Sequence, residues 1–252
     1  MRLARVAFAV LVLAPAFALA ANAQAPSHSL TMLEMQVACG PPTTFDMPDQ
    51  ALHVIGSQEP GKRFLFANQE LLVLDGGGAR GLQLGQQFFV RRPIITGTER
   101  KYPSAIHTLG WLTIVSMNDK TALARVDYVC DAIQEGDYLD TFAAPSIPSE
   151  FEQPTAIEFS DLDFAALGRV LTGPENTNSA GAGGLVLIDR GTDQSVHPGA
   201  RFAVYRDLHR TGMPLASVGE GVVLSVGKTM SLTKITRSRD PIITGDYVVP
   251  RK

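Results

Sequence analysis

A glycine-rich loop contains the residues of this chain that could most directly support chemistry. Residues 74–81 read LDGGGARG, and successive backbone N–H groups in such a loop can hold the negative oxygen that forms during acyl transfer. An acyl hydrolase of this kind also needs a serine nucleophile in a G-x-S-x-G turn. Ser217 and Ser225 come nearest, in LASVG and VLSVG, and both lack the first glycine. The loop alone is therefore not a catalytic set.

The same loop resembles the oxyanion-hole motif of patatin-like lipid hydrolases. That resemblance implies an acyl hydrolase acting through residues 75–81, which is the alternative function for this chain. The family continues from its glycines into a helix, whereas residues 82–91 here are typical of a turn and a strand. A late catalytic Asp-Gly pair is also missing. The sequence therefore favours a non-enzymatic protein that needs no cofactor.

Basic and aromatic residues form a second group of candidates. Arg91, Arg92, Tyr205 and Arg206 come at the ends of two similar apolar segments, and such a cluster would suit contacts to carboxylates or sugars. The alternative is that these charges mark strand edges and discourage edge pairing. No metal site is expected, because the histidines lack the spacing of metal ligands. They are His28, His53, His107, His197 and His209.

Cys39 and Cys130 are the two cysteines of the chain. In an exported protein they form one possible internal disulfide. Closing a loop of this length would contribute about 4 kcal/mol in the chain-entropy model. The alternative is a pair of inert buried thiols. A bridge would tie the segment around residues 30–44 to the end of the first half of the chain.

The elements that position these residues form a weak internal repeat. Four landmarks recur in the same order, separated by alternating apolar residues that are typical of strands. The repeat aligns the glycine-rich loop with Asp189 to Gly191, so a strand that ends in Asp and a Gly turn is the shared part. Copy one contains LGQQFFVRR at 84–92, LGW at 109–111, TALARV at 121–126 and GDYL at 136–139; copy two contains PGARFAVYR at 198–206, VGE at 218–220, MSLTKI at 230–235 and GDYV at 245–248.

Each copy closes on Gly-Asp-Tyr, and the sequence explains this as turn chemistry. Glycine permits a positive φ, and an aspartate side chain can accept hydrogen bonds from nearby backbone. The alternative is a catalytic role for Asp137 or Asp246. Strands this short, in copies of 80 to 90 residues, are expected to close into small barrels or sandwiches. We predict an all-β chain.

The chain divides into five segments by composition. Residues 1–23 carry Arg2, Arg5, an apolar run and a small-residue exit, which predicts a cleaved signal peptide. An N-terminal extension, in which residues 30–37 could form a strand, occupies residues 24–52. The first β-domain is predicted at 53–142 and the second at 167–252. Between them, residues 143–166 are rich in proline and predict a linker.

Charge and hydropathy limit the partners. The formal net charge is −3, or −5 without Arg2 and Arg5, and so modest an acidic balance argues against nucleic-acid binding. After the signal peptide no stretch is long and apolar enough to predict a membrane span. The expected location is the periplasm or the medium.

The repeat resembles a small β-domain at the C-terminus of some LysM-containing envelope proteins and of flagellar assembly protein T. Copy two carries the resemblance best, through residues 198–206, 218–220 and 242–246; copy one departs at Trp111, where copy two has Glu220. The resemblance implies two tandem SH3-like β-barrels in the periplasm and a role in binding or assembly, with an envelope protein or a cell-wall polymer as partner. It transfers no catalytic residue.

Overall fold

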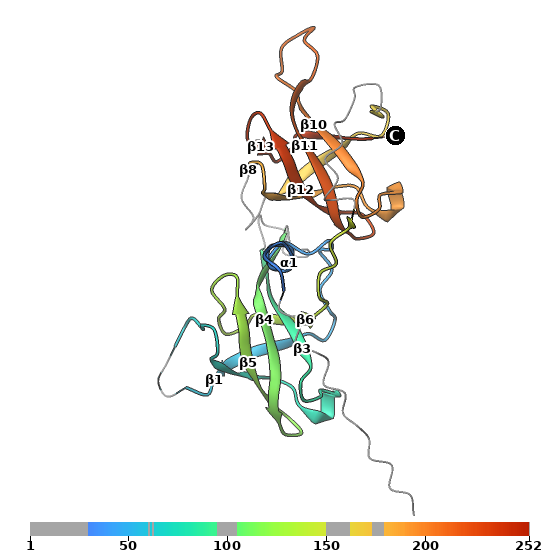
Figure 1. Ribbon diagram of the computed structural model, residues 1–252. Coiled ribbons are helices and arrows are strands. Elements are labelled where there is room, and N and C mark those ends of the chain that lie inside the picture. Colours follow the sequence, from blue (N-terminus) through green and yellow to red (C-terminus); the bar gives the residue numbers. More distant parts are fainter. Residues whose placement is uncertain are drawn as a thin grey trace, which may run out of the picture.

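The computed structural model describes residues 30–59, 61, 63–94, 105–149, 162–172 and 179–251. Within these ranges the chain forms two closed barrels of antiparallel strands, one after the other in sequence (Figure 1). This confirms the prediction of an all-β chain with two tandem barrel domains. The expected signal peptide, residues 1–23, lies outside the described residues.

Barrel 1 is closed by six strands in the order β1-β2-β5-β4-β3-β6. Side chains alternate between its interior and its outer surface, as the pleat of a strand requires. Leu72 and Leu74 are fully buried in the interior, and the alternate residues of this strand, Leu71 and Val73, are only partly buried. The strands are β1 Leu52–Ser57, β2 Leu71–Leu74, β3 Gln87–Ile94, β4 Ala105–Met117, β5 Ala122–Val129 and β6 Tyr138–Thr141.

Barrel 2 repeats this topology strand for strand. Its closed order is β10-β11-β12-β9-β7-β14, which becomes the order of barrel 1 when β7, β9, β10, β11, β12 and β14 replace β1 to β6. A short sheet of β8 and β13 is added. The strands are β7 Gly168–Thr172, β8 Ser179–Ala180, β9 Leu185–Ile188, β10 Arg201–Arg206, β11 Ala216–Val226, β12 Ser231–Ser238, β13 Ile242–Ile243 and β14 Tyr247–Pro250.

Individual backbone hydrogen bonds recur in the two barrels. Val54 N–H donates to the Asp137 carbonyl at 2.9 Å, and Val170 N–H donates to the Asp246 carbonyl at the same distance. Gly85 and Gly199 each donate to a residue of the following long strand at 2.8 Å. The repeat in the sequence is therefore one barrel built twice, down to single turn contacts.

The N-terminal segment forms a helix, α1 Met32–Ala38, so the strand expected at residues 30–37 is wrong. The segment has no clear apolar period in the sequence. The residues are nevertheless strong helix formers, and a capping box starts the helix: the Thr31 side chain accepts from Glu34 N–H, while the Glu34 carboxylate accepts from Thr31 N–H. This local signal therefore decides for a helix.

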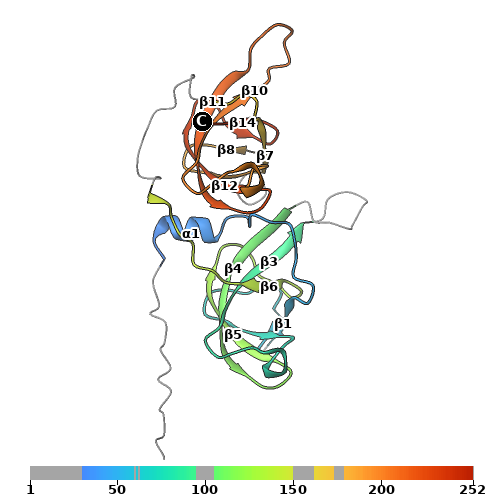
Figure 2. The same ribbon diagram turned by 90° about the vertical axis from the view of Figure 1, so that its right-hand side faces the viewer.

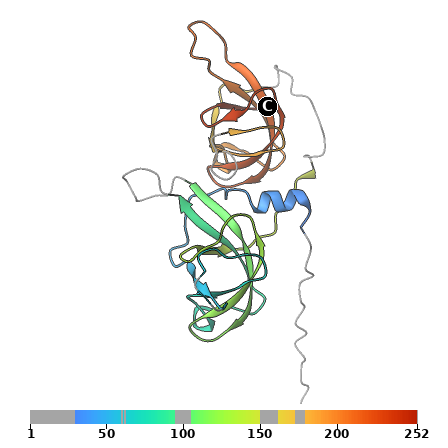
Figure 3. The same ribbon diagram turned by 90° about the vertical axis from the view of Figure 1, so that its left-hand side faces the viewer.

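Helix α1 lies between the barrels, and residues 39–45 continue from it; we call residues 32–45 the strap (Figure 1). Figure 2 and Figure 3 show the same placement from two further sides. Leu33 and Val37, one turn apart, pack on barrel 2, whereas Met35 and Ala38 pack on barrel 1. A helix this short buries two apolar faces at once, so it joins the barrels.

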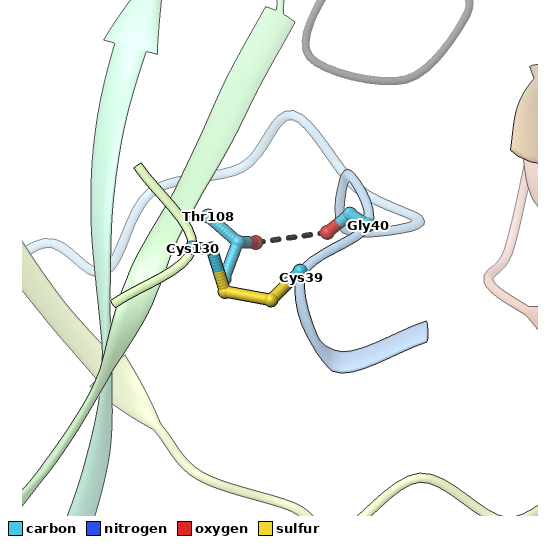
Figure 4. Close-up of a disulfide and its surroundings, with 4 residues drawn as sticks. All are labelled: Cys39, Gly40, Thr108 and Cys130. Atoms are coloured by element: carbon cyan, nitrogen blue, oxygen red, sulfur yellow. Dashed lines mark hydrogen bonds between the residues drawn. A yellow bond between two sulfur atoms is a disulfide. The ribbon is translucent and has the colours of Figure 1, made fainter. Parts of the chain in front are cut away.

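A disulfide fixes the strap to barrel 1. Cys39 and Cys130 are bonded with their Cα atoms 5.5 Å apart, which confirms the predicted pairing (Figure 4). Beside the bond, the buried Thr108 hydroxyl donates to the Gly40 carbonyl at 2.9 Å (Figure 4). Gly40 lies close to barrel 2, because a Cβ there would be in tight contact with a methyl group of Leu232, at 3.1 Å. The strap therefore contacts both barrels within two residues of the disulfide.

We predict that the Cys39→Ser, Cys130→Ser double variant keeps both barrels but loses the fixed position of α1. The bridge joins residues 91 apart, so its loss should lower the free energy of unfolding by about 4 kcal/mol. In the double variant, the α1 amides should exchange hydrogen faster than they do in the wild type, whereas exchange of the β4 and β11 amides should change less. Unreduced wild-type protein should take up no thiol label; two labels, or unchanged protection of α1 in the variant, would contradict the tether.

Candidate functional site

The glycine-rich loop is a structural brace that occurs in both barrels. Gly78 and Ala79 N–H donate to the carbonyls of Asn118 and Asp119 at 2.8 and 3.0 Å. Thr192 and Asp193 make the equivalent bonds, at 3.0 Å, in barrel 2. These N–H groups already have acceptors in the adjacent hairpin, so they are not free to hold an oxyanion.

Close packing explains the glycine in this loop. A Cβ on Gly77 would lie 2.0 Å from the Asn118 carbonyl oxygen, and one on Gly191 would lie 2.5 Å from the Gly227 carbonyl oxygen. The aspartate that precedes each loop accepts a backbone hydrogen bond, Asp75 from His53 N–H at 2.7 Å and Asp189 from Arg169 N–H at 2.6 Å. The feature shared by the two copies is thus turn architecture.

Two predicted binding residues, Arg92 and Arg206, form equivalent ion pairs. Arg92 donates through Nε and Nη2 to the buried Asp137 carboxylate at 2.7 and 2.8 Å. Arg206 does the same to Asp246, at 2.8 Å for both bonds. Each pair is bidentate, and this geometry holds the strand end against the Gly-Asp-Tyr turn.

Further contacts complete the second pair. Asp246 also accepts from Ile243 N–H at 2.8 Å, a turn contact to the residue three positions earlier and not to the backbone two residues on. Arg206 donates in addition to Asp240 and to the Pro241 carbonyl, both at 2.5 Å. The hydrogen bonds to Asp246 raise the pKa of the Arg206 guanidinium further above its usual value. Arg206 therefore has its main donors engaged within the barrel.

Tyr205, the third predicted residue, lies in an apolar cluster on the outside of barrel 2. Its ring is 5.4 Å from that of Phe164, and Leu162 belongs to the same cluster. Burial raises the pKa of its hydroxyl above the usual value. The segment before β7 therefore covers Tyr205, which leaves only 8 % of the residue exposed.

Arg91, the fourth predicted residue, has a different environment. It pairs with Asp140 at 2.5 Å and lies 4.8 Å from the centre of the Phe89 ring. Its Nε atom is buried and makes no hydrogen bond with the described part of the chain. Burial lowers the pKa of the guanidinium, and the Asp140 charge opposes this shift. Because the Nε atom is buried, it is not open to the solvent.

Arg91 lines a cleft of about 460 Å³ between the barrels. The strap forms one wall, residues 143–146 form another, and the hairpin of β11 and β12 contributes Leu224, Ser225 and Leu232. Within this lining Arg91 is the charged residue. Proline keeps the walls stiff because its ring fixes φ. The prolines are Pro41, Pro42, Pro145 and Pro198.

Sequence reasoning found one residue of this cleft and missed the rest. Residues 143–146 were interpreted as linker and residues 40–44 as part of an extension, since neither has a periodic pattern. Their positions depend on the disulfide and on α1, which bring both segments beside Arg91. The proline at position 41 or 145 signals stiffness, but no local signal indicates that the two segments face each other.

The described ranges, residues 30–59, 61, 63–94, 105–149, 162–172 and 179–251, contain neither a metal site nor a membrane-spanning helix. No group of three or more His, Cys, Asp or Glu there could hold a metal ion. His28 lies outside these ranges. The described helices are also too short to cross a bilayer.

No known protein family matches the chain, and no curated protein matches it significantly. The resemblance to LysM-containing envelope proteins and to flagellar assembly protein T therefore remains a prediction.

We predict that Asp246→Asn lowers the free energy of unfolding by about 3 kcal/mol, because a guanidinium would remain without its buried counter-charge. Denaturant unfolding measures this loss. A matched control is Glu220→Gln, which removes an exposed pair with Arg237 and should cost less than about 1 kcal/mol. Equal losses in the two variants would show that the buried pair is not a main support of the turn.

A second prediction concerns alkaline pH. Burial raises the pKa of the Tyr138 hydroxyl to about 12, with Arg91 opposing the shift. The unfolded chain loses this proton near its ordinary pKa of about 10, so the contribution to stability is complete below about pH 10 and is lost as the pH rises to about 12. The free energy of unfolding should therefore fall less steeply over this interval in Tyr138→Phe. Identical slopes in variant and wild type would contradict the assignment.

Proposed function

We propose that the chain is an exported, non-enzymatic protein of the bacterial cell envelope that binds or assembles with a partner through the cleft between its barrels. The partner is an envelope protein or a cell-wall polymer. The observation that carries this proposal is the cleft itself, which a covalently fixed strap and a second segment enclose around Arg91.

The chemistry of the cleft suits binding. Ligand sites are concave and mostly apolar, with few polar groups that fix orientation. Here the walls are mostly aliphatic residues and prolines with a few hydroxyl side chains, and Arg91 supplies the charge. A guanidinium matches carboxylate groups in particular, and both proteins and cell-wall polymers can carry these. The cleft offers orientation and no nucleophile with an activating base.

Two further observations support the compartment and the absence of catalysis. The Cys39–Cys130 bond is of a kind that persists in oxidising compartments. The glycine-rich loop, which is the basis of the acyl hydrolase alternative, uses its N–H groups in the fold of both barrels. The net charge of −3 gives no electrostatic reason to expect nucleic acid as partner.

Capture experiments with Ala144→Trp test this proposal. Ala144 is an exposed wall residue of the cleft and lies outside the barrels, so tryptophan there should fill the cleft without disturbing the core. We expect immobilised wild-type protein to retain either purified cell-wall polymer or a specific envelope protein. The variant should retain about tenfold less, which corresponds to a loss of about 1.4 kcal/mol.

The matched control is Ala79→Trp, which places the same side chain at an exposed alanine of the glycine-rich loop. It should bind as the wild type does. Equal binding by all three proteins would exclude the cleft as the site. Ester hydrolysis that Ser217→Ala or Ser225→Ala abolishes would instead support the enzyme.

A further inference from the structure

Barrel 2 carries an outward apolar face that α1 covers. Leu33 and Val37 of the helix, with Phe45 of the strap, pack against five leucines on four adjacent strands. Four of these leucines are at most 2 % exposed although they point away from the barrel interior. They are Leu171 on β7, Leu185 and Leu187 on β9, Leu224 on β11 and Leu232 on β12.

Strand register gives the counterpart of each leucine in barrel 1. β2 pairs with β5 as β9 pairs with β12, and β4 pairs with β5 as β11 pairs with β12. The β-bulges also correspond between the barrels. The register shifts at equivalent points of β1 and β7, and at equivalent points of β4 and β11. The resulting pairs are Leu171 and Ile55, Leu185 and Leu71, Leu187 and Val73, Leu224 and Val115, and Leu232 and Leu123.

All five counterparts are aliphatic, so barrel 1 has the same apolar face; we call it the open face. Ile55 is 50 % exposed and Val115 is 39 % exposed. Leu71, Val73 and Leu123 are partly exposed, where their counterparts are covered. Helix α1 covers this apolar face on barrel 2. On barrel 1 it packs instead on a different surface, around Phe89 and Trp111.

The polar rim of the face is repeated too. In barrel 2, Lys234 donates to the Gln36 side chain of α1 at 2.6 Å, and Gln36 donates to the Gly183 carbonyl at 3.2 Å. Register places Arg125, which is 45 % exposed, at the position of Lys234. Gln69 stands at the position of Gly183, since each donates to the same point of the neighbouring strand at 2.8 Å and has a positive φ. The donor and the acceptor for a polar helix side chain are therefore both present.

One difference limits what can bind. The strap leaves barrel 2 by passing over Gly227, where a Cβ would lie 2.2 Å from the Thr43 carbonyl oxygen. The equivalent hairpin position in barrel 1 is Asn118, whose side chain fills this place with bonds to its own turn. The open face therefore lacks the path that the strap takes after its helix, so the matching occupant is a helix without such an extended segment.

We propose that the open face of barrel 1 is a docking site for a short amphipathic helix of a partner protein. The helix presents two aliphatic side chains one turn apart, and beside them an amide side chain whose oxygen accepts from Arg125 and whose nitrogen donates to the Gln69 carbonyl, as Gln36 does with Lys234 and Gly183 on barrel 2. The open face follows from the repeat and is separate from the cleft, so failure of binding at the cleft leaves this site intact. It extends the binding function by naming a second surface and the chemistry of what it takes.

The helix of this chain supplies the probe. A synthetic peptide of residues 31–38, with a covalent staple between positions 31 and 35, holds Leu33, Gln36 and Val37 on the side opposite the staple, because a helix turns once in 3.6 residues. Titrated into isotope-labelled full-length protein, it should shift the amide resonances around the five residues of the open face, with saturation. Val115→Asp should weaken this binding by at least about tenfold, since it puts a charge in the apolar centre.

The matched control is Leu84→Asp, which changes another exposed aliphatic residue of barrel 1 that is outside the face. It should bind the peptide as the wild type does. The proposal is overturned if shifts are absent, if they fall on barrel 2 because the peptide displaces α1, or if both variants weaken binding equally. Concentration-dependent self-association through the open face would also overturn it, because the occupant would then be a second copy.

Discussion

The two-sided packing of α1 is the constraint on which the arrangement of this protein depends. A helix of seven residues is too short to be stable alone in water. It persists because Leu33 and Val37 bury against barrel 2 while Met35 and Ala38 bury against barrel 1. Complete burial of a Leu, Val or Met side chain contributes about 1.5–3 kcal/mol, and these partly buried side chains contribute a fraction of that each. The same contacts that stabilise the helix therefore fix the barrels to each other and create the cleft.

The disulfide complements this packing by selecting its position. Cys39 follows the helix directly, so its bond to Cys130 fixes the C-terminal end of α1 on barrel 1. The next residue, Gly40, already touches Leu232 of barrel 2. The compartment that keeps the bond oxidised thus bears on the shape of the binding cleft as well as on stability.

Much of the fold could be predicted from the sequence, because the repeat carries residues whose roles are local. The Gly-Asp-Tyr turns and the strands that end in Asp75 and Asp189 indicate two similar β-units, and only closed barrels leave such short strands without open edges. The pairing of Asp137 with Arg92 was not predicted. This ion pair joins residues from separate strands. The sequence feature that could have indicated it is that both copies have an arginine at the end of the same strand.

The candidate site was harder to predict for the same physical reason. Arg91 and Arg92 are neighbours of the same type, but strand alternation sends them to different faces, one to the cleft and the other to a turn carboxylate. Tyr205 occupies the place of Arg91 in copy two, since both pair with the tyrosine of the closing turn, yet Phe164 covers it. Sequence indicates the strand and its residue types. It does not indicate which outside segment arrives to cover them.

The two barrels therefore differ in the segments that pack on their outer surfaces more than in the residues that fill their interiors. The interiors perform the same task with similar aliphatic residues, such as Leu74 and Ile188 at the ends of β2 and β9. On the outside, residues before β7 cover the surface around Tyr205 in barrel 2, whereas α1 and Phe142 cover the equivalent aromatic surface around Phe89 in barrel 1. When one fold is used twice, the segments that pack on its outer surface distinguish the two copies. An apolar outer surface on which no such segment packs is where a partner protein can bind.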